Sequence, residues 1–280
     1  MNNAVRKMTV ADIRDSLESV VPPALQEPWD NSGLIIGFES NSVKRILTCL
    51  EINEDVIKEA AEIGAEMIVS HHPLIFSAKK TLNHSVCSDR MVMELIKRGI
   101  SVYSAHTSFD KVKGGNNDTA AELLGLENVR NLKGLRVAEP ADMIRNNDEA
   151  DIGRIGRFAE PVRLEQAAAM VSEKFDVELR SIRAVGEPES TISTAGVCTG
   201  AGAEFAEMAA DSGCELLITG DVKYHQAQAA LELGICLLDA GHYGTEKLFA
   251  KAMTKKLEPV LPEDVEIIES TVELEPFRVF

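Results

Sequence analysis

"AAEIGAEMIVS", residues 60–70, carries the pattern that decides the fold: the end of a helix, a glycine stop and a short apolar strand. Gly64 suits the left-handed conformation in which many helices end, and the apolar run after it predicts a buried strand. On its N-terminal side, Asn53 is a suitable cap for that helix, and RILTCLEI (residues 45–52) is another strand-like run. Strands that alternate with helices of this length predict an α/β fold.

Similar signals continue towards the N-terminus. In TVADIRDSLESVVPP, Thr9 is a good helix cap, Asp12 stands three residues later, and Pro22 is expected to end the helix. WDNSGLIIG, residues 29–37, then forms a polar turn that leads into a short apolar strand. We interpret Trp29, the only tryptophan, as a packing anchor beside that turn.

The chain also repeats itself. Residues 60–70 align without gaps to AADSGCELLIT (209–219), and GISVYSAHTSFD (99–110) resembles GICLLDAGHYGTE (234–246) with one inserted residue. The second pair of segments shares a histidine followed four residues later by a carboxylate. Two matches in the same order predict two similar α/β halves with mixed sheets.

The repeat sets the expected domain boundaries. We treat residues 1–280 as one unit with a first half at about 1–130 and a second half at about 187–280. DIGRIGRFAEPVRLEQAAAMVSEKFDVELRSIRAV predicts strand, helix and strand within a connecting segment of about 131–186. The Gly, Asn and Asp residues of RNNDEADIG indicate a loop near the start of that segment.

The composition narrows the classes of function. The chain has 280 residues, of which 45% are hydrophobic and 26% charged, a balance that allows a sizeable core. A formal charge of −16 argues against a generally basic nucleic-acid-binding surface. No apolar run approaches the roughly 20 residues of a membrane-spanning helix, and the N-terminus lacks an apolar signal core. Five widely spaced cysteines without a C-x-x-C pair indicate reduced thiols, so we expect a cytoplasmic protein.

Two adjacent histidines, His71 and His72, follow the strand of residues 66–70, although the chain has only six histidines. Pro73 favours extended geometry in the residue before it, and neighbouring side chains on an extended chain point in opposite directions. We therefore expect two metal ions, one on each side, rather than a single ion chelated by both imidazoles. The ends of strands are also where open α/β sheets place ligand sites.

Two further histidine–carboxylate pairs follow strands. His106 and Asp110 come after ISVYSA, and His242 and Glu246 come after ICLLDA. At a spacing of four residues, both side chains of a pair share one face of a helix. Imidazole and carboxylate together suit Zn, Fe, Mn, Co or Ni, and one carboxylate can bridge two ions. His106 could instead carry protons or orient a ligand.

Other polar positions have weaker signals. His84 and His225 are interpreted as hydrogen-bonded core histidines, and Asp221, which the repeat aligns with the second histidine of the pair, as a residue that supports the site. The Gly-rich loops at 114–116 and 200–202 precede expected helices, whose N-termini could attract a phosphate. A turn followed by a helix cap is the favoured interpretation of both loops.

Five motifs occur in order along the chain: WDNSGL, SHHPLIF, SAHTSFD, TGDVKYHQA and GHYGTEK. Together they resemble the Nif-three-like family, whose bacterial members are called GTP cyclohydrolase I type 2 homologues, over nearly the whole chain. The resemblance implies an α/β fold of two similar halves, a dinuclear metal site between them, and a homohexamer. The implied ligands are His71 and His72 on different ions, Asp110, His242, and Glu246 as the bridge.

Two hypotheses about function follow. The first is a metal-dependent hydrolase with two divalent ions per chain, acting on a nucleotide or related phosphorylated small molecule. The family name implies GTP as the candidate substrate, and His106 would serve as an acid or base. The second is a non-catalytic protein that binds or handles metal and has a protein partner. A base-recognition pocket would separate the two, and the sequence alone reveals none.

Overall fold

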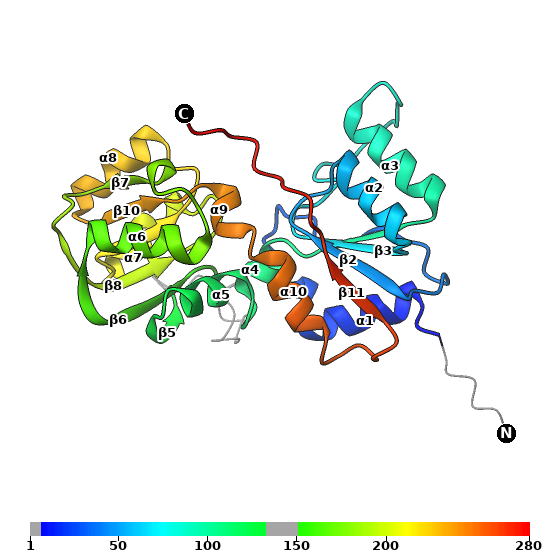
Figure 1. Cartoon of the computed structure of the whole chain (residues 1–280), viewed down its shortest axis with the longest axis horizontal. Coiled ribbons are helices and arrows are strands. Elements are labelled where there is room, and N and C mark those ends of the chain that lie inside the picture. Colours follow the sequence, from blue (N-terminus) through cyan, green and yellow to red (C-terminus); the bar gives the residue numbers. More distant parts are fainter. Residues whose placement is uncertain (1–6, 133–150) are drawn as a thin grey trace. The chain divides into compact units, whose positions relative to one another are not determined.

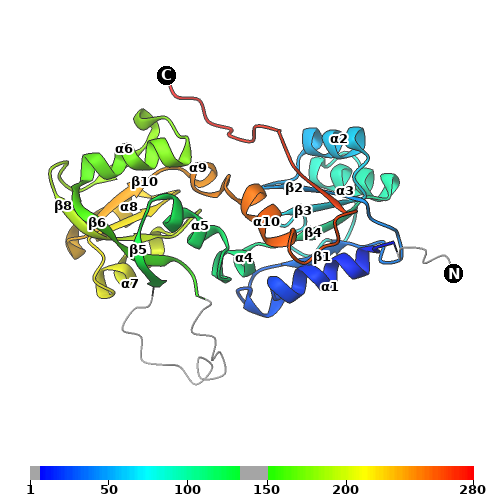
Figure 2. The ribbon, with the colours of Figure 1, turned by 60° about the horizontal axis from the view of Figure 1, so that its bottom comes forward.

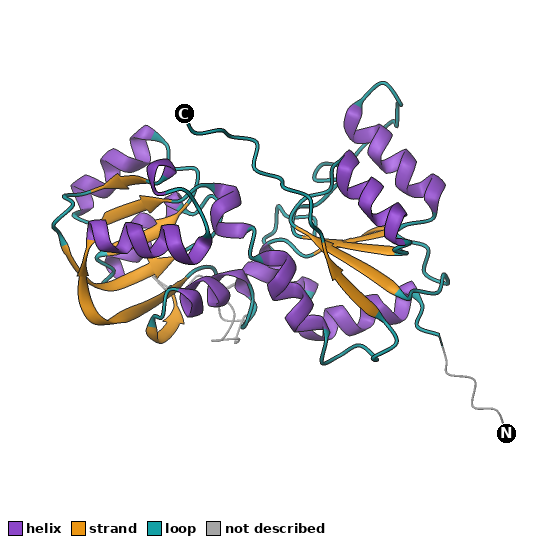
Figure 3. Ribbon diagram, viewed as in Figure 1, coloured by secondary structure: helices purple, strands orange, loops and turns teal. Residues whose placement is uncertain are grey.

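The computed structural model describes residues 7–132 and 151–280, which pack into two compact units. Unit 1 is built from the described residues up to Phe109 together with Phe249–Leu274. Unit 2 is built from the described residues of Asp110–Leu248 together with Glu275–Phe280. Each unit contains one mixed β-sheet between layers of helices, as the strands and helices of Figures 1 and 3 show.

The sheet of unit 1 has five strands in the order β1-β4-β3-β2-β11. Its strands are β1 (Gly33–Ile36), β2 (Arg45–Cys49), β3 (Met67–Ser70), β4 (Ser101–Ser104) and β11 (Glu266–Glu269). All neighbouring pairs are parallel except β1 and β4, which are antiparallel. Every residue of β3 and β4 is buried, as expected for strands that are covered on both faces.

Four helices cover this sheet. They are α1 (Val10–Val20), α2 (Glu54–Ile63), α3 (Cys87–Arg98) and α10 (Phe249–Leu257). Figure 2 shows α2 and α3 on one face and α1 and α10 on the other. The expected start and stop signals are confirmed: Thr9 and Asp12 form a capping box for α1, Asn53 caps α2, and Gly64 ends α2 with φ +68°.

The sheet of unit 2 has six strands in the order β5-β6-β8-β9-β10-β7. Its strands are β5 (Glu127–Asn131), β6 (Arg154–Arg163), β7 (Arg183–Val185), β8 (Thr191–Val197), β9 (Leu216–Thr219) and β10 (Cys236–Asp239). β8, β9 and β10 are parallel neighbours. The pairs β5–β6, β6–β8 and β7–β10 are antiparallel.

Helices pack on both faces of the second sheet. Those with a buried face in this unit are α5 (Asn116–Leu123), α6 (Leu164–Phe175), α7 (Ala206–Asp211) and α8 (Tyr224–Leu233). One apolar cluster joins α5 and α6 to the sheet, and another joins α7 and α8 to it. Two five-residue helices, α4 (Thr107–Lys111) and α9 (His242–Glu246), follow β4 and β10. Short 3₁₀ helices cover Pro23–Leu25, Leu179–Ser181 and Ala203–Phe205.

The two sheets repeat one arrangement. The order β1-β4-β3-β2 in unit 1 corresponds to β7-β10-β9-β8 in unit 2, with three parallel strands and one antiparallel edge strand in each. The aligned segments fall on β3 and β9 and on β4 and β10, so the internal repeat in the sequence is a structural repeat. The prediction of two similar α/β halves with mixed sheets is confirmed.

The division between the units differs from the expected boundaries at 130 and 187. α5 and β5 belong to unit 2, because β5 pairs with β6. β11 completes unit 1, because it pairs in parallel with β2. The predicted strand, helix and strand are β6, α6 and β7, which form part of unit 2 and its sheet. The loop predicted at RNNDEADIG lies mostly outside the described residues.

Two further expectations concern cysteines and membranes. Cys49, Cys198, Cys214 and Cys236 are buried free thiols and Cys87 is an exposed one, so the expectation of reduced cysteines agrees with the structure. Within the described ranges, every helix is too short or too polar to cross a bilayer.

Candidate metal centre

Three histidines of unit 1 gather at one edge of its sheet. β3 ends at Ser70, directly before His71 and His72, and β4 ends at Ser104, two residues before His106. Because β3 and β4 are parallel neighbours, with Ser70 opposite Ser104, their C-terminal ends meet at the same edge. Each of the three imidazoles offers a nitrogen, and these nitrogens all lie within 4.8 Å of one another. We call this group the histidine cluster.

His71 is the most buried member of the histidine cluster. Its side chain is enclosed, and its Nδ1 lies 2.9 Å from the carbonyl oxygen of Ala105. A carbonyl oxygen can only accept a hydrogen bond, so Nδ1 carries the proton and Nε2 keeps the lone pair that a metal ion needs. His72 is only partly buried, and its Nδ1 lies 3.8 Å from a carboxylate oxygen of Glu51.

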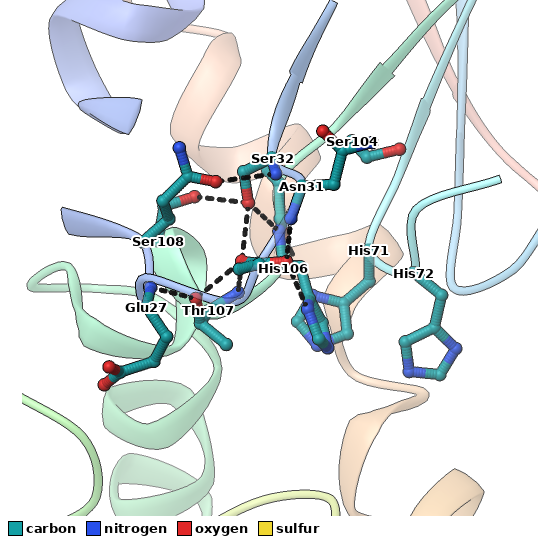
Figure 4. Close-up of polar contacts among 12 residues, drawn as sticks. Glu27, Asn31, Ser32, His71, His72, Ser104, His106, Thr107 and Ser108 are labelled. Atoms are coloured by element: carbon teal, nitrogen blue, oxygen red, sulfur yellow. Dashed lines mark hydrogen bonds and ion pairs between the residues drawn. The ribbon is translucent and has the colours of Figure 1, made fainter. Parts of the chain in front are cut away.

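A buried carboxylate orients His106. Asp30, whose side chain is fully buried, accepts hydrogen bonds on Oδ1 from His106 Nδ1 at 2.8 Å and from the Asn31 N–H at 2.7 Å. Its Oδ2 accepts from the N–H of Thr107 at 3.1 Å, the hydroxyl of Thr107 at 2.6 Å and the hydroxyl of Ser32 at 2.9 Å. Figure 4 shows these contacts around Ser32, His106 and Thr107. The arrangement leaves the lone pair of His106 on Nε2.

Electrostatics keep Asp30 ionised. Burial by itself raises the pKa of the Asp30 carboxyl, but hydrogen bonds from His106 and Thr107 outweigh that effect and hold the pKa well below its usual range. WDNSGL predicted a polar turn, but that pattern by itself gave Asp30 no role. The polar residues that follow it were the available signal, since a carboxylate needs several donors before it can be buried.

The expectation that His71 and His72 point in opposite directions is wrong. β3 ends at Ser70, so the two histidines lie in a bend rather than on an extended strand. The N–H groups of both donate to the carbonyl oxygen of Leu50, and their ring centroids are 5.2 Å apart. The alternation of side chains, which requires extended backbone, therefore does not apply here.

A second group lies in unit 2, at the start of α9. His242 is the first residue of that helix, and its Nε2 lies 2.9 Å from Oε2 of Glu246, one turn later. Its Nδ1 lies 2.8 Å from Oδ2 of Asp221, which has the left-handed φ of +55° that is uncommon outside glycine. The structure thus places Asp221 where the sequence repeat expected a supporting residue. His242 Nε2 and Glu246 Oε2 are spaced so that one cation could replace the proton between them.

Asp110 joins the second group. It is buried, and one of its carboxylate oxygens lies within 4.8 Å of one from Glu246, which is also buried. Asn116 donates to the Asp110 carboxylate and Asn117 to its backbone carbonyl, each at 3.0 Å. Two buried carboxylates this close repel each other unless a cation neutralises them or one of them is protonated. We call Asp110, His242 and Glu246 the carboxylate cluster.

Gly200 allows Glu246 to approach the backbone of a neighbouring loop. Its φ is +68°, and a Cβ added there would stand 2.1 Å from Oε1 of Glu246. The Gly200 N–H donates to the hydroxyl of Thr245 at 2.9 Å. Because a carboxylate already lies against the loop at 200–202, the electrostatics there disfavour a phosphate.

The donors of the two clusters, imidazole and carboxylate, are of the types that divalent transition metals bind. Zn, Fe, Mn, Co and Ni all accept both types of ligand. Burial raises the pKa of the Cys198 thiol, and the charges of Asp110 and Glu246 raise it further, so this thiol is protonated when no metal is bound.

Two interpretations of single residues are wrong. His84 and His225 are exposed rather than core histidines. Trp29 is not a packing anchor, because 58% of its surface is exposed. Its loop is held by the hydrogen bonds of Asp30 and by those of the neighbouring backbone instead of by burial of the indole.

These observations define a class of protein: a duplicated α/β fold that carries imidazole and carboxylate groups suited to metal at the ends of its central strands. Residues 8–276 match the family described as Duf34/NIF3 (NGG1p interacting factor 3). The chain belongs to this family, as its motifs predicted.

Known relatives agree in sequence and fold. The chain is 35% identical over 272 residues to a protein of Clostridium perfringens named GTP cyclohydrolase 1 type 2 homolog, covering 97% of this chain and 99% of that one. A Bacillus cereus protein related to NIF3 has the same fold, with a TM-score of 0.89 at 24% identity, covering 98% and 100%. A hypothetical protein of Staphylococcus aureus gives a TM-score of 0.88 at 26% identity, also covering 98% and 100%.

Proposed function

We propose that this protein binds two divalent metal ions per chain and hydrolyses a nucleotide or a related phosphorylated small molecule. His71, His72, Asp110, His242 and Glu246 would hold the ions, with Glu246 as the bridge. The metal would be Zn, Fe, Mn, Co or Ni. The name GTP cyclohydrolase 1 type 2 homolog, printed for the Clostridium perfringens relative, makes GTP the first substrate to test.

The observation that carries this proposal is the set of hydrogen bonds that orient the imidazoles. Asp30 and the Ala105 carbonyl hold the Nδ1 atoms of His106 and His71, so both rings keep their lone pairs on Nε2 before any ion or substrate arrives. Such preorganisation is typical of ligands and of acid–base groups, because a freely turning imidazole would lose affinity. Divalent cations in such sites supply Lewis acidity, which activates water at neutral pH.

His106 has the second role in the proposal. Its Nε2 would accept or deliver a proton, while Asp30 stabilises the protonated ring and prevents the other tautomer. Ser32 helps to position His106. Its hydroxyl accepts a hydrogen bond from the backbone N–H of His106 and donates one to the carboxylate of Asp30. His106 therefore acts through a fixed ring rather than through a mobile one.

A turnover screen tests the proposal. Protein loaded in turn with each of the five metals is assayed against nucleotides and phosphoesters, beside His72→Ala and the control variant His84→Ala. Turnover that is lost in His72→Ala and kept in His84→Ala supports the hydrolase. No turnover, with metal that binds tightly and exchanges, favours the alternative of a non-catalytic metal-binding or metal-handling protein with a protein partner.

Elemental analysis tests the number of ions. We expect about two per chain after saturation and desalting. A value near one that His71→Ala leaves unchanged would rule out the dinuclear centre. This measurement decides metal binding independently of any substrate.

The assembly and compartment complete the proposal. We propose that the protein is a cytoplasmic homo-oligomer, and a hexamer as the family resemblance implies. We further propose that it binds neither nucleic acid nor a membrane. Size exclusion with light scattering tests the assembly, and a mass near 30.5 kDa at micromolar concentration would contradict it.

A further inference from the structure

Two large aromatic side chains are exposed beside the histidine cluster. Trp29 is 58% exposed and Phe76 is 51% exposed, and their ring centroids are 6.1 Å apart. Aromatic rings of this size usually lose most of their surface on folding, because burial of their apolar area is strongly favourable. Two neighbouring rings that stay exposed beside a candidate site therefore suggest a surface that binds a ligand.

The exposure does not result from loose loops. Asn31 donates from its side chain to the carbonyl of Ile75, so the loop that carries Trp29 is connected to the one that carries Phe76. Asp30, the residue after Trp29, accepts hydrogen bonds from four neighbouring residues. The rings are thus presented by backbone that is held at both loops.

Both rings contact a member of the histidine cluster. The His106 ring centroid lies 6.0 Å from that of Trp29 at 71°, and 6.4 Å from that of Phe76 at 81°. These are T-shaped contacts, in which the edge of one ring meets the face of the other, so His106 covers at most one face of each aromatic side chain. A ring stacked on Trp29 or Phe76 would therefore sit on a direct neighbour of His106.

We propose that Trp29 and Phe76 form a stacking platform for a planar heteroaromatic ring, such as a nucleobase, and that they position this part of the substrate beside His106. The inference rests on the proposed function and names the kind of substrate it would take. The ring would contact both side chains, stacked on an open face of one and in edge contact with the other. Insertion between the two would need a separation of about 7 Å, twice the usual contact distance, which exceeds the 6.1 Å present.

Stacking suits this position for a physical reason. Every nucleobase has a π-face, so aromatic side chains bind bases without a dedicated hydrogen-bonding pocket. The absence of a recognisable base pocket in the sequence is therefore compatible with binding of a nucleotide. The platform would select for a ring while leaving the choice among bases to other contacts.

Trp29 is the only tryptophan, so its fluorescence reports on the platform alone. We would titrate guanosine monophosphate into metal-free and zinc-loaded protein and compare it with ribose 5-phosphate, which has the sugar and phosphate but no base. Inner-filter effects are corrected with free N-acetyltryptophanamide. The platform predicts that guanosine monophosphate quenches Trp29 and shields it from acrylamide, whereas ribose 5-phosphate does neither.

Phe76→Leu keeps an apolar side chain but removes the ring. It should weaken binding of guanosine monophosphate by about 5- to 150-fold, the range for loss of one stacking contact. Tyr224→Leu removes another exposed ring, whose contact is with His225, and should leave binding unchanged. Equal quenching by both ligands, or equal affinity in Phe76→Leu and wild type, would overturn the platform.

The same experiment separates the alternatives. If acrylamide cannot reach Trp29 in ligand-free protein, a second copy of the chain covers the rings and the platform is wrong. Base-dependent binding without turnover in the screen would refute the hydrolase and leave the platform intact. Turnover without base-dependent binding would support the hydrolase and refute the platform.

Discussion

Asp30→Asn is the most informative single change in unit 1. The amide has nearly the shape of the carboxylate, so the substitution removes charge and one acceptor without opening a cavity. Asp30 receives five hydrogen bonds, two on Oδ1 and three on Oδ2. An asparagine has one oxygen, so the NH₂ group must face one of these two sets of donors.

Each orientation of the amide has a different cost. With the NH₂ towards His106, that ring must move its proton to Nε2, and the Asn31 N–H loses its acceptor. With the NH₂ towards Thr107, the hydroxyls can rotate, but the Thr107 N–H cannot. Either way one backbone donor is left unpaired and charge-assisted bonds are lost, which lowers the free energy of unfolding by about 2–4 kcal/mol. The first orientation also removes the lone pair on Nε2 with which His106 would accept a proton.

Two assays distinguish these effects. Urea unfolding in EDTA, followed by Trp29 fluorescence, measures the stability of unit 1 without metal. Turnover of the metal-loaded protein measures the acid–base role of His106, and we expect its rate to fall about 10²- to 10⁴-fold, the usual contribution of a positioned acid or base. Asp264→Asn, at an exposed position of the same unit, is the matched control. If both variants behave alike in both assays, the assignment of Asp30 as the group that orients His106 is wrong.

The remaining predictions concern the carboxylate cluster and acid stability. Glu246→Gln should fold and lose at least one ion in a calorimetric titration, whereas Glu232→Gln on the exposed face of α8 should not; wild-type affinity for two ions would exclude Glu246 as the bridge. Gly200→Ala and Gly213→Ala share the cost of a positive φ, about 1–2 kcal/mol, but only the former displaces Glu246 and should also lower metal affinity. Because folding lowers the pKa of Asp30, its contribution is complete above the unfolded value near 4 and is lost as the pH falls below it. Wild-type stability in EDTA should therefore fall more steeply between about pH 5 and pH 2 than that of Asp30→Asn; parallel curves would contradict this.

Local chemistry accounts for what was predictable. Asn53 and Gly64 bound α2 because a cap and a left-handed stop act on their own helix turn. The repeat between 60–70 and 209–219 revealed the duplicated fold, since equivalent strands need equivalent apolar runs. Membership of the family was also readable, because its motifs are continuous stretches of sequence. Such features depend on neighbours within a few residues, so they can be read along one segment of the chain.

Tertiary structure alone decided how the candidate site is arranged. Asp30 and His106 are 76 positions apart, and only the pairing of β1 with β4 brings their loops together. The directions of His71 and His72 were mispredicted because strand alternation stops where β3 ends, a point set by hydrogen bonds to Leu50. Burial of a carboxylate depends on donors that converge from separate segments, and no pattern along one segment records that convergence.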